Sequence, residues 1–263
     1  SAYSSLGINK IGIPMTNKGM DLNKLHKTLS SVKNAMVCSL FGALNPYADE
    51  YSNGLADMDY KRAFMRICNA AKAPIIEVDN FRCFLPAGSP NPIKSIDTGS
   101  SVIYIGSMTK VLPNFRLGWI IAPKGVITKL ADIRMQINSQ QDTITQVIAE
   151  EFLCIDDFEG NMEQFQAWLR ENKAIMLSIL NKYLSDVAQI NSHSAAPQVY
   201  IRFNDAIDVK KMFRNRGNLM FTPGYILDDD FLQYVSVSLV SMPPERFEKS
   251  IIQLAELARK SKK

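Results

Sequence analysis

The sequence predicts an α/β fold, with a mostly parallel sheet in a large first domain and a small α+β domain after it. Three observations lead to this prediction. Short β-rich runs alternate with helical patterns through residues 1–155. Long helical stretches dominate from Lys129 onward, and β-rich runs return only near residue 198. We therefore expect a large domain over residues 1–155, and a connecting long helix with a small domain over residues 156–263.

The first domain contains both strand and helix patterns. Leucines at 22, 25 and 29 share one face of a helix that Asp21 can cap, and a second helix is expected over Met58–Ala71. Strands that alternate with helices are usually joined in parallel and covered on both faces. The predicted strands are Lys10–Pro14, Ala35–Leu40, Pro74–Val78, Ser101–Ile105 and Leu117–Ala122.

The second part begins with helical patterns and ends with mixed ones. Helices are expected over Gln146–Leu153 and over Asn161–Leu184, and the second is long enough to cross a domain. The elements expected after it are the strands Gln198–Phe203 and Tyr234–Leu239 and the helices Val209–Arg214 and Pro244–Ala258.

Charge and hydropathy exclude several kinds of partner. The net charge of +4 comes from basic residues scattered among almost as many acidic ones, so we expect no direct nucleic-acid contact from this chain. No apolar run approaches the roughly 20 residues of a membrane span, and the N-terminus lacks signal-peptide features. We expect a cytoplasmic protein without a membrane partner, in which Cys38, Cys68, Cys83 and Cys154 are reduced core thiols.

The stretch YIGSMTKVLPNFRLGW, residues 104–119, sets two cations into an apolar, glycine-punctuated run. Ligands of open α/β sheets bind beyond the carboxyl ends of the strands, and Lys110 comes soon after a predicted strand. A lysine held there in a dry pocket can form a Schiff base with an aldehyde cofactor. The alternative is that Lys110 and Arg116 are solvated cations beside a buried strand.

The segment GSMTKVLPNFRLGWIIAP resembles the cofactor-lysine segment of fold-type I enzymes that use pyridoxal 5'-phosphate (PLP). It is most similar to the aminotransferase-like domain of MocR-type regulators in the GntR family. The matching positions are Gly106, Ser107, Thr109, Lys110, Pro113, Arg116 and Gly118. The resemblance implies a PLP-dependent transferase fold in which Lys110 carries PLP. It also implies that Ser107, Thr109 and Arg116 bind the cofactor, although one residue fewer separates lysine from arginine than is usual in the family.

Two further segments resemble the same family. The run ALNPY, residues 43–47, is similar to the family's Asn-Pro-Thr-Gly loop, which implies that Asn45 donates to the cofactor's ring oxygen; an ordinary Asn-Pro turn is the alternative. The run APIIEVDNF is similar to the strand whose carboxylate pairs with the protonated pyridine nitrogen, and Asp79 is the candidate. Alignment on Glu77, however, places Val78 where one family aspartate stands. The family's tyrosine falls at Phe81, which can pack but cannot donate.

Two features of the family have no counterpart in this sequence. A phosphate-binding glycine loop and the family's first helix would precede residue 1, so we expect either a fragment of a longer polypeptide or a natural truncation. A MocR-type parent carries a winged-helix DNA-binding domain still further upstream. The arginine that clamps a substrate carboxylate is replaced by Val235 or Ser236, and Arg202 is better explained as a surface charge.

Three functions remain open at this point. The chain is a PLP-binding, effector-sensing and dimerisation domain of a transcriptional regulator, a PLP-dependent aminotransferase acting on an amino acid, or a degenerate domain without cofactor. The first is the preferred hypothesis, and it implies a small amino compound as effector or substrate and a homodimer as the assembly. Whether the chain is an enzyme stays undecided at this stage.

Overall fold

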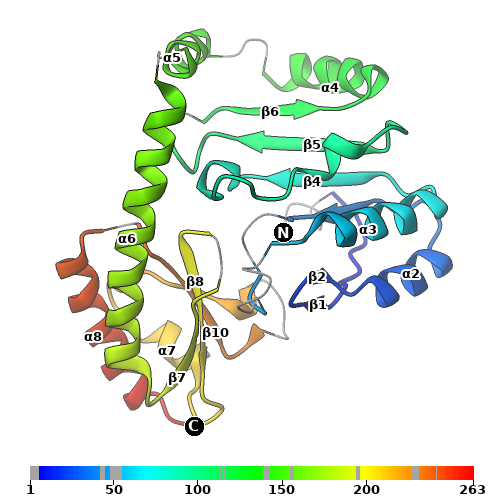
Figure 1. Ribbon diagram of the computed structural model, residues 1–263. Coiled ribbons are helices and arrows are strands. Elements are labelled where there is room, and N and C mark those ends of the chain that lie inside the picture. Colours follow the sequence, from blue (N-terminus) through cyan, green and yellow to red (C-terminus); the bar gives the residue numbers. More distant parts are fainter. Residues whose placement is uncertain are drawn as a thin grey trace.

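The computed structural model describes residues 6–41, 45–47, 55–112, 114, 116–138, 142–154, 157–193, 196–226, 231–240 and 242–263. In this part of the chain, two four-stranded sheets and a two-stranded hairpin form the β-structure. The long helix α6 (Phe158–Leu184) runs beside both four-stranded sheets and ends against the second (Figure 1). The α/β fold predicted from the sequence is confirmed.

The first sheet has the strand order β3-β4-β5-β6. Strands β3 (Val37–Ser39), β4 (Ile75–Asp79) and β5 (Val102–Ser107) are parallel, and β6 (Gly118–Ile121) is antiparallel to β5. Four of the five strands predicted for this region are thereby confirmed. The sheet is mostly parallel, as expected.

The fifth predicted strand, Lys10–Pro14, is wrong. These residues form no strand, because nearly all of their side chains are exposed and no neighbouring strand pairs with them among the described residues. The hairpin of β1 (Met15–Thr16) and β2 (Gly19–Met20) follows instead. Gly19 has φ +135°, and a Cβ there would meet the Tyr60 ring at 2.9 Å, so the hairpin packs closely on the helix that carries Tyr60.

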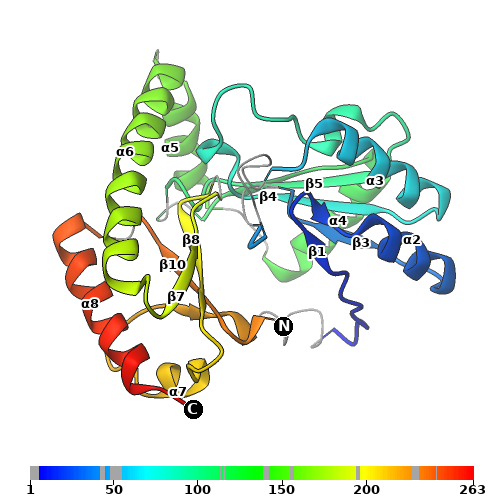
Figure 2. The ribbon, with the colours of Figure 1, turned by 60° about the horizontal axis from the view of Figure 1, so that its bottom comes forward.

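Helices α2 (Leu22–Ser31) and α3 (Met58–Ala70) cover one face of this sheet (Figure 2). The predicted cap of α2 is confirmed, because the Asp21 carboxylate accepts from the backbone N–H groups of Asn23 and Lys24. Side chains of β4 and β5 that point toward α3 are buried, whereas the alternate ones are half-buried. The core on the α3 side contains Leu25, Leu29, Val37, Phe41, Tyr60, Phe64, Cys68, Ile75, Ile93 and Val102.

The second sheet is antiparallel with the order β7-β8-β10-β9. Its strands are β7 (Ala188–Asn191), β8 (Gln198–Phe203), β9 (Thr222–Pro223) and β10 (Tyr234–Ser238). Helices α6, α7 (Val209–Arg214) and α8 (Pro244–Lys260) pack on one face. Their shared core includes Leu180, Leu184, Val199, Ile201, Phe203, Met212, Val235, Phe247, Ile251 and Leu254.

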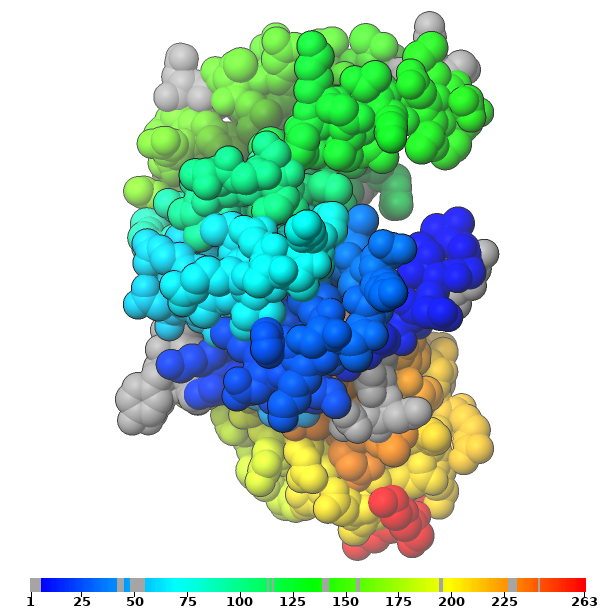
Figure 3. Space-filling view, turned by 90° about the vertical axis from the view of Figure 1, so that its right-hand side faces the viewer, coloured from blue at the N-terminus to red at the C-terminus, as the bar shows by residue number. Residues whose placement is uncertain are grey.

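An apolar surface lies at the β6 end of the first sheet. Helix α4 (Lys124–Ile137) has no buried residue, and α5 (Thr143–Leu153) buries only Ala149. The green region in Figure 3 shows these helices gathered at the end opposite the C-terminal part of the chain. Exposed large apolar side chains here are Trp119, Ile120, Ile121, Ile127, Leu130, Ile133, Met135 and Ile137. Surfaces of this kind are typical of contacts with another polypeptide segment.

Some expectations about the chain's organisation are answered only partly. The predicted domain boundary falls at residues 155 and 156, which lie outside the described residues. No described helix combines the length and apolar content needed to cross a membrane. None of the four cysteines forms a disulfide in the part of the chain that the structure describes, and only Cys68 is buried, while Cys38 and Cys154 are exposed. The expectation of core thiols is wrong for Cys38 because it lies between two inward-facing residues of β3, so its side chain points to the other face.

The core of the second unit provides the first prediction. Leu180 is fully buried against the second sheet, whereas Ile175 on the same helix is 47% exposed. Leu180→Ala should lower the free energy of unfolding by about 2–5 kcal/mol, and Ile175→Ala by well under half of that. Urea unfolding followed by circular dichroism measures both. Equal losses would contradict this assignment of the core.

Candidate functional site

The candidate site lies at the carboxyl ends of β4 and β5. Asp79 ends β4 and is the register partner of Gly106, and the turn that holds Lys110 follows β5 directly. The Lys110 ammonium lies 5.4 Å from the centroid of the Phe81 ring. The structure therefore brings together two predicted site residues that are 29 positions apart. Lys110 is exposed, which differs from the dry pocket expected for it.

Phe81 is buried between Lys110 and the long helix. It packs in a cluster with Phe84, Leu85 and Leu169, and its ring centroid is 6.0 Å from that of Phe84. As the sequence predicts, this side chain packs but has no hydroxyl to donate. Phe81 is therefore a buried apolar support beneath the Lys110 side chain.

Ser107 and Thr109 form a compact hydroxyl pair just before Lys110. Their hydroxyl oxygens are 2.8 Å apart, and the Thr109 backbone N–H donates to Ser107 Oγ at 3.1 Å. Ser107 Oγ also lies 3.2 Å from the Leu117 carbonyl, to which it can donate. Two hydroxyls fixed side by side next to a lysine are a donor set that suits phosphate oxygens.

Arg116 is exposed in the segment that leads into β6, and the predicted Pro113 lies outside the described residues. The role of Arg116 in binding phosphate stays a prediction. Gly106 has a local reason to be glycine, since a Cβ there would be 2.3 Å from the Trp119 ring. Trp119 is a site neighbour that the sequence argument missed, and the antiparallel pairing of β6 with β5 brings it there.

Asn45 is buried and fully engaged within the chain. Its side-chain amide donates to the carbonyls of Thr16 at 2.8 Å and Asn17 at 3.0 Å, and its Oδ1 accepts from the Tyr47 N–H. Both amide hydrogens therefore hold the β1–β2 hairpin. Donation from Asn45 to a cofactor stays a prediction, and it requires one of these bonds to be exchanged.

The next two residues, Pro46 and Tyr47, contact the second sheet. The Asn191 side chain of β7 donates to the Pro46 carbonyl at 2.6 Å. The Tyr47 ring lies 5.9 Å from that of Phe231 and 6.3 Å from that of Tyr234. The segment 45–47 is therefore a bridge between the hairpin and the second sheet.

Strand register decides which face Asp79 occupies. Val78 pairs with Ile105, and Asp79 pairs with Gly106. Because side chains alternate along a strand, Val78 shares its face with Ser107, and Asp79 lies on the α3 face. The Tyr104 hydroxyl on that face donates to Asp79 Oδ2 at 3.3 Å, which agrees with this placement.

The other carboxylate oxygen, Asp79 Oδ1, is buried and has no hydrogen-bond partner among the described residues. The cavity that Asp79 helps to line has a volume of about 10 Å³, roughly the space of one water molecule, so a pyridine ring does not fit there. Burial raises the pKa of Asp79. Pairing of Asp79 with a cofactor's ring nitrogen stays a prediction, and both the face and the cavity argue against it.

Glu77 is a buried acid whose two carboxylate oxygens both accept hydrogen bonds, a role that the sequence pattern did not indicate. Its two oxygens accept from the backbone N–H groups of Ile93 at 2.7 Å and Lys94 at 2.9 Å, which begin a short 3-10 helix. Burial raises the pKa of Glu77 in spite of these bonds. The carboxylate thus fixes the end of the loop that follows Phe84.

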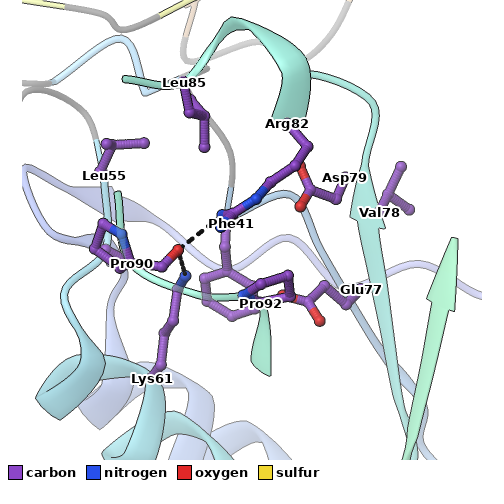
Figure 4. A pocket seen from close by; sticks show the side chains of 11 residues that line it. Phe41, Leu55, Lys61, Glu77, Val78, Asp79, Arg82, Leu85, Pro90 and Pro92 are labelled. Atoms are coloured by element: carbon purple, nitrogen blue, oxygen red, sulfur yellow. Dashed lines mark hydrogen bonds between the residues drawn. The ribbon is translucent and has the colours of Figure 1, made fainter. Parts of the chain in front are cut away.

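Two cations, Lys61 and Arg82, point toward the Pro90 carbonyl of the same loop, as Figure 4 shows. Lys61 Nζ donates to the Asn91 carbonyl at 2.7 Å and lies 3.4 Å from the Pro90 carbonyl, to which Arg82 donates at 2.9 Å. Lys61 is buried, and burial lowers its pKa. Lys61 lies three residues before Phe64 and therefore on the apolar face of α3. This position in the sequence could have indicated that the lysine is buried.

The position expected for a carboxylate clamp contains no guanidinium. Val235 points into the core of the second unit, and Ser236 lies on the opposite face of β10. Arg202 pairs with Asp205 at 3.1 Å, in agreement with its interpretation as a surface charge. Neither Ser236 nor Val235 can replace a bidentate arginine.

Comparison with known families and relatives agrees with the resemblance seen in the sequence. The model of the Aminotransferase class I and II family matches residues 66–228. The uncharacterised HTH-type transcriptional regulator YdfD of Bacillus subtilis is 27% identical over 96% of this chain and 52% of its own length. The HTH-type transcriptional regulator NorG of Staphylococcus aureus strain N315 is 27% identical over 86% of this chain and 51% of its own. The chain thus spans about half the length of these relatives.

Solved structures share the fold at low identity. An archaeal alanine:glyoxylate aminotransferase superposes with a TM-score of 0.86 at 23% identity, covering 98% of this chain and 66% of its own. The α-aminoadipate aminotransferase LysN of Thermus thermophilus, solved with N-(5'-phosphopyridoxyl)-L-leucine, gives 0.85 at 18% identity, covering 97% and 66%. The predicted fold-type I architecture is confirmed.

Asp79 and Glu77 form a matched pair for a test of buried charge. Burial raises the pKa of the Asp79 carboxyl, so the folded chain favours the protonated form of Asp79. Protonation of Asp79 therefore stabilises the fold at pH values below the usual aspartate pKa, and this stabilisation is lost as the pH rises through the raised pKa of the folded state. Asp79→Asn should therefore raise the free energy of unfolding by on the order of 1 kcal/mol near neutral pH, with the gain shrinking toward about pH 4.

Burial raises the pKa of Glu77 as well, so removal of its charge also brings a gain, but the carboxylate accepts two backbone N–H groups and an amide has one acceptor oxygen. The buried N–H group left without an acceptor costs about 1–3 kcal/mol, so Glu77→Gln should be less stable than Asp79→Asn near neutral pH and should lower the free energy of unfolding of the chain. Denaturant unfolding of the chain without added cofactor, at several pH values, measures both variants. An Asp79→Asn loss as large as that of Glu77→Gln would mean that Asp79 has a stabilising partner.

Proposed function

Because the chain belongs to the class I and II aminotransferase family, we propose that it is the effector-sensing and dimerisation domain of a transcriptional regulator. Relatives that match nearly all of this chain are named HTH-type transcriptional regulators, and this chain corresponds to about half of their length. The DNA-binding activity would belong to another part of the polypeptide. This function would place the protein in the cytoplasm.

The single observation that carries the cofactor proposal is the hydroxyl pair fixed beside Lys110. Ser107 and Thr109 would bind the phosphate of PLP, with Arg116 as a further cation, and Lys110 would hold the aldehyde carbon. When bound, PLP supplies an aldehyde that exchanges between amines. A small amino compound that competes with Lys110 is therefore the kind of effector that this site would sense.

Three features favour sensing over turnover. The residue that shares a face with Ser107 is the apolar Val78, which cannot keep a pyridine nitrogen protonated. Phe81 offers no hydroxyl, and the position of the carboxylate clamp holds Ser236 or Val235. Similarity to aminotransferase structures under 25% identity supports the fold alone.

A homodimer is the proposed assembly. Closed two-fold dimers are the commonest homo-oligomers, and a regulator that reads two DNA half-sites uses the same symmetry. The exposed apolar side chains of β6 and α4 support this proposal, because such surfaces suit further protein contacts.

Lys110 should be the residue that PLP modifies. Incubation with PLP, reduction with borohydride and peptide mass mapping should place one phosphopyridoxyl group on Lys110, because the Ser107 and Thr109 hydroxyls hold the phosphate nearby. Lys124→Ala, which removes another lysine of the first unit, should leave the labelling unchanged. Labelling spread over surface lysines, or undiminished in Lys110→Ala, would contradict the site.

Transamination of common α-amino acids should be slow or undetectable. Loss of a bidentate guanidinium contact costs on the order of 2–5 kcal/mol, and a misoriented substrate can react roughly a hundredfold more slowly. The PLP-treated protein would be mixed with amino and keto acids, and keto-acid formation followed over time. Several turnovers per second with any of them would favour the aminotransferase hypothesis over the sensor.

A further inference from the structure

A second ligand site is suggested by a cleft between the loop after Phe81 and the long helix. Its volume is about 460 Å³, within the range of sites that bind small molecules. One side is formed by Phe84 and residues 86–89, and the other by α6 and by residues 192 and 193, which follow β7. The cleft therefore lies between parts of the chain that belong to the two sheets.

The ionisable side chains that line the cleft are all basic. Arg170 and Lys173 lie three positions apart on α6, so they share one face of the helix, and the imidazole of His193 is contributed by the segment after β7. No acidic side chain is among the twelve described residues that line it. Burial lowers the pKa of Lys173, so an anion beside it would favour its charged form.

The remaining lining is largely apolar. Leu55, Phe84 and Leu169 provide aliphatic and aromatic surface, and Gln166, Ser89 and Ser192 add neutral polar groups. A ligand that matches both the basic and the apolar parts of the lining has an acidic group and an apolar body. We infer that this cleft binds a small organic anion, a carboxylate with an aromatic or branched apolar body.

An occupant of the cleft would contact Phe84, which packs on Phe81, the support of Lys110. The Gln166 side chain donates to the Leu85 carbonyl at 2.9 Å and to the Cys83 carbonyl at 3.3 Å, which ties α6 to this loop. Phe84 lines the cleft and packs on Phe81, whose ring lies under the Lys110 ammonium. Anion binding would therefore restrain the same residues that position Lys110. The inference does not depend on PLP, because no predicted cofactor residue lines the cleft.

Phenylacetate and phenylacetamide are suitable probes, because they share an aromatic body and differ in charge. Titration of the full chain, followed by protein-observed NMR, should show phenylacetate binding with a Kd below about 1 mM and phenylacetamide at least tenfold weaker. The double variant Arg170→Gln, Lys173→Gln should weaken phenylacetate binding at least tenfold. Lys182→Gln, on the same helix but outside the cleft, is the matched control and should bind as the unmodified chain does.

Ser192→Trp provides a second variant that removes no charge but fills the cleft, and it should also abolish binding. Circular dichroism would verify that each variant is folded. Equal affinity for the two probes, no phenylacetate binding by the unmodified chain, or binding that survives both cleft variants would overturn the inference. Failure of Lys110 to accept PLP would leave these outcomes unaffected, so the two proposals are tested separately.

Discussion

The parallel register between β4 and β5 determines what the candidate site can contain. Val78 is fixed opposite Ile105, so an apolar side chain shares its face with Ser107, while Asp79 is directed to the α3 face. A shift of one residue would exchange the two, but buried Ile75 and Val102 pair in the same ladder and would lose their place in the core. The packing of Ile75 and Val102 at the start of the two strands thereby determines that Val78, and not Asp79, shares a face with Ser107 at their carboxyl ends.

A second constraint is the set of buried charges beneath the loop after Phe84. Glu77 is buried because two backbone N–H groups satisfy it, and Lys61 is buried because it holds the Asn91 carbonyl. Such groups are costly unless every partner is present, so they specify one loop conformation. That loop forms a wall of the cleft, and Phe84, from which it starts, packs on Phe81 beneath Lys110. Stability of the loop and the position of Lys110 are therefore linked.

Much of the fold could be predicted because its helices and central strands have regular apolar spacing. Helix Val209–Arg214 begins and ends where the pattern predicts, and the Asp21 cap is in place. Strand β7 was not predicted because its sequence, AQIN, has only one β-branched residue. Its hydrogen-bonded pairing with β8 stabilises the strand in place of a local β preference.

The site was harder to predict than the fold. Asp79 was the candidate carboxylate, but alignment on Glu77 placed Val78 at a family aspartate and left the register uncertain by one residue, and pairing with β5 assigns the two side chains to their faces. The contact of Gln166 with Leu85 joins residues 81 positions apart, so no local pattern could indicate the cleft.

Nitrogen-15 NMR of ring-labelled PLP bound to the protein tests most directly whether this register gives a sensor. The ring nitrogen should be unprotonated near neutral pH in the unmodified chain, since Val78 offers it no acid, and protonated in Val78→Asp. A ring nitrogen that is protonated in the unmodified chain, and loses that proton in Asp79→Asn, would contradict the account. That result would assign Asp79 to the cofactor and restore the case for catalysis.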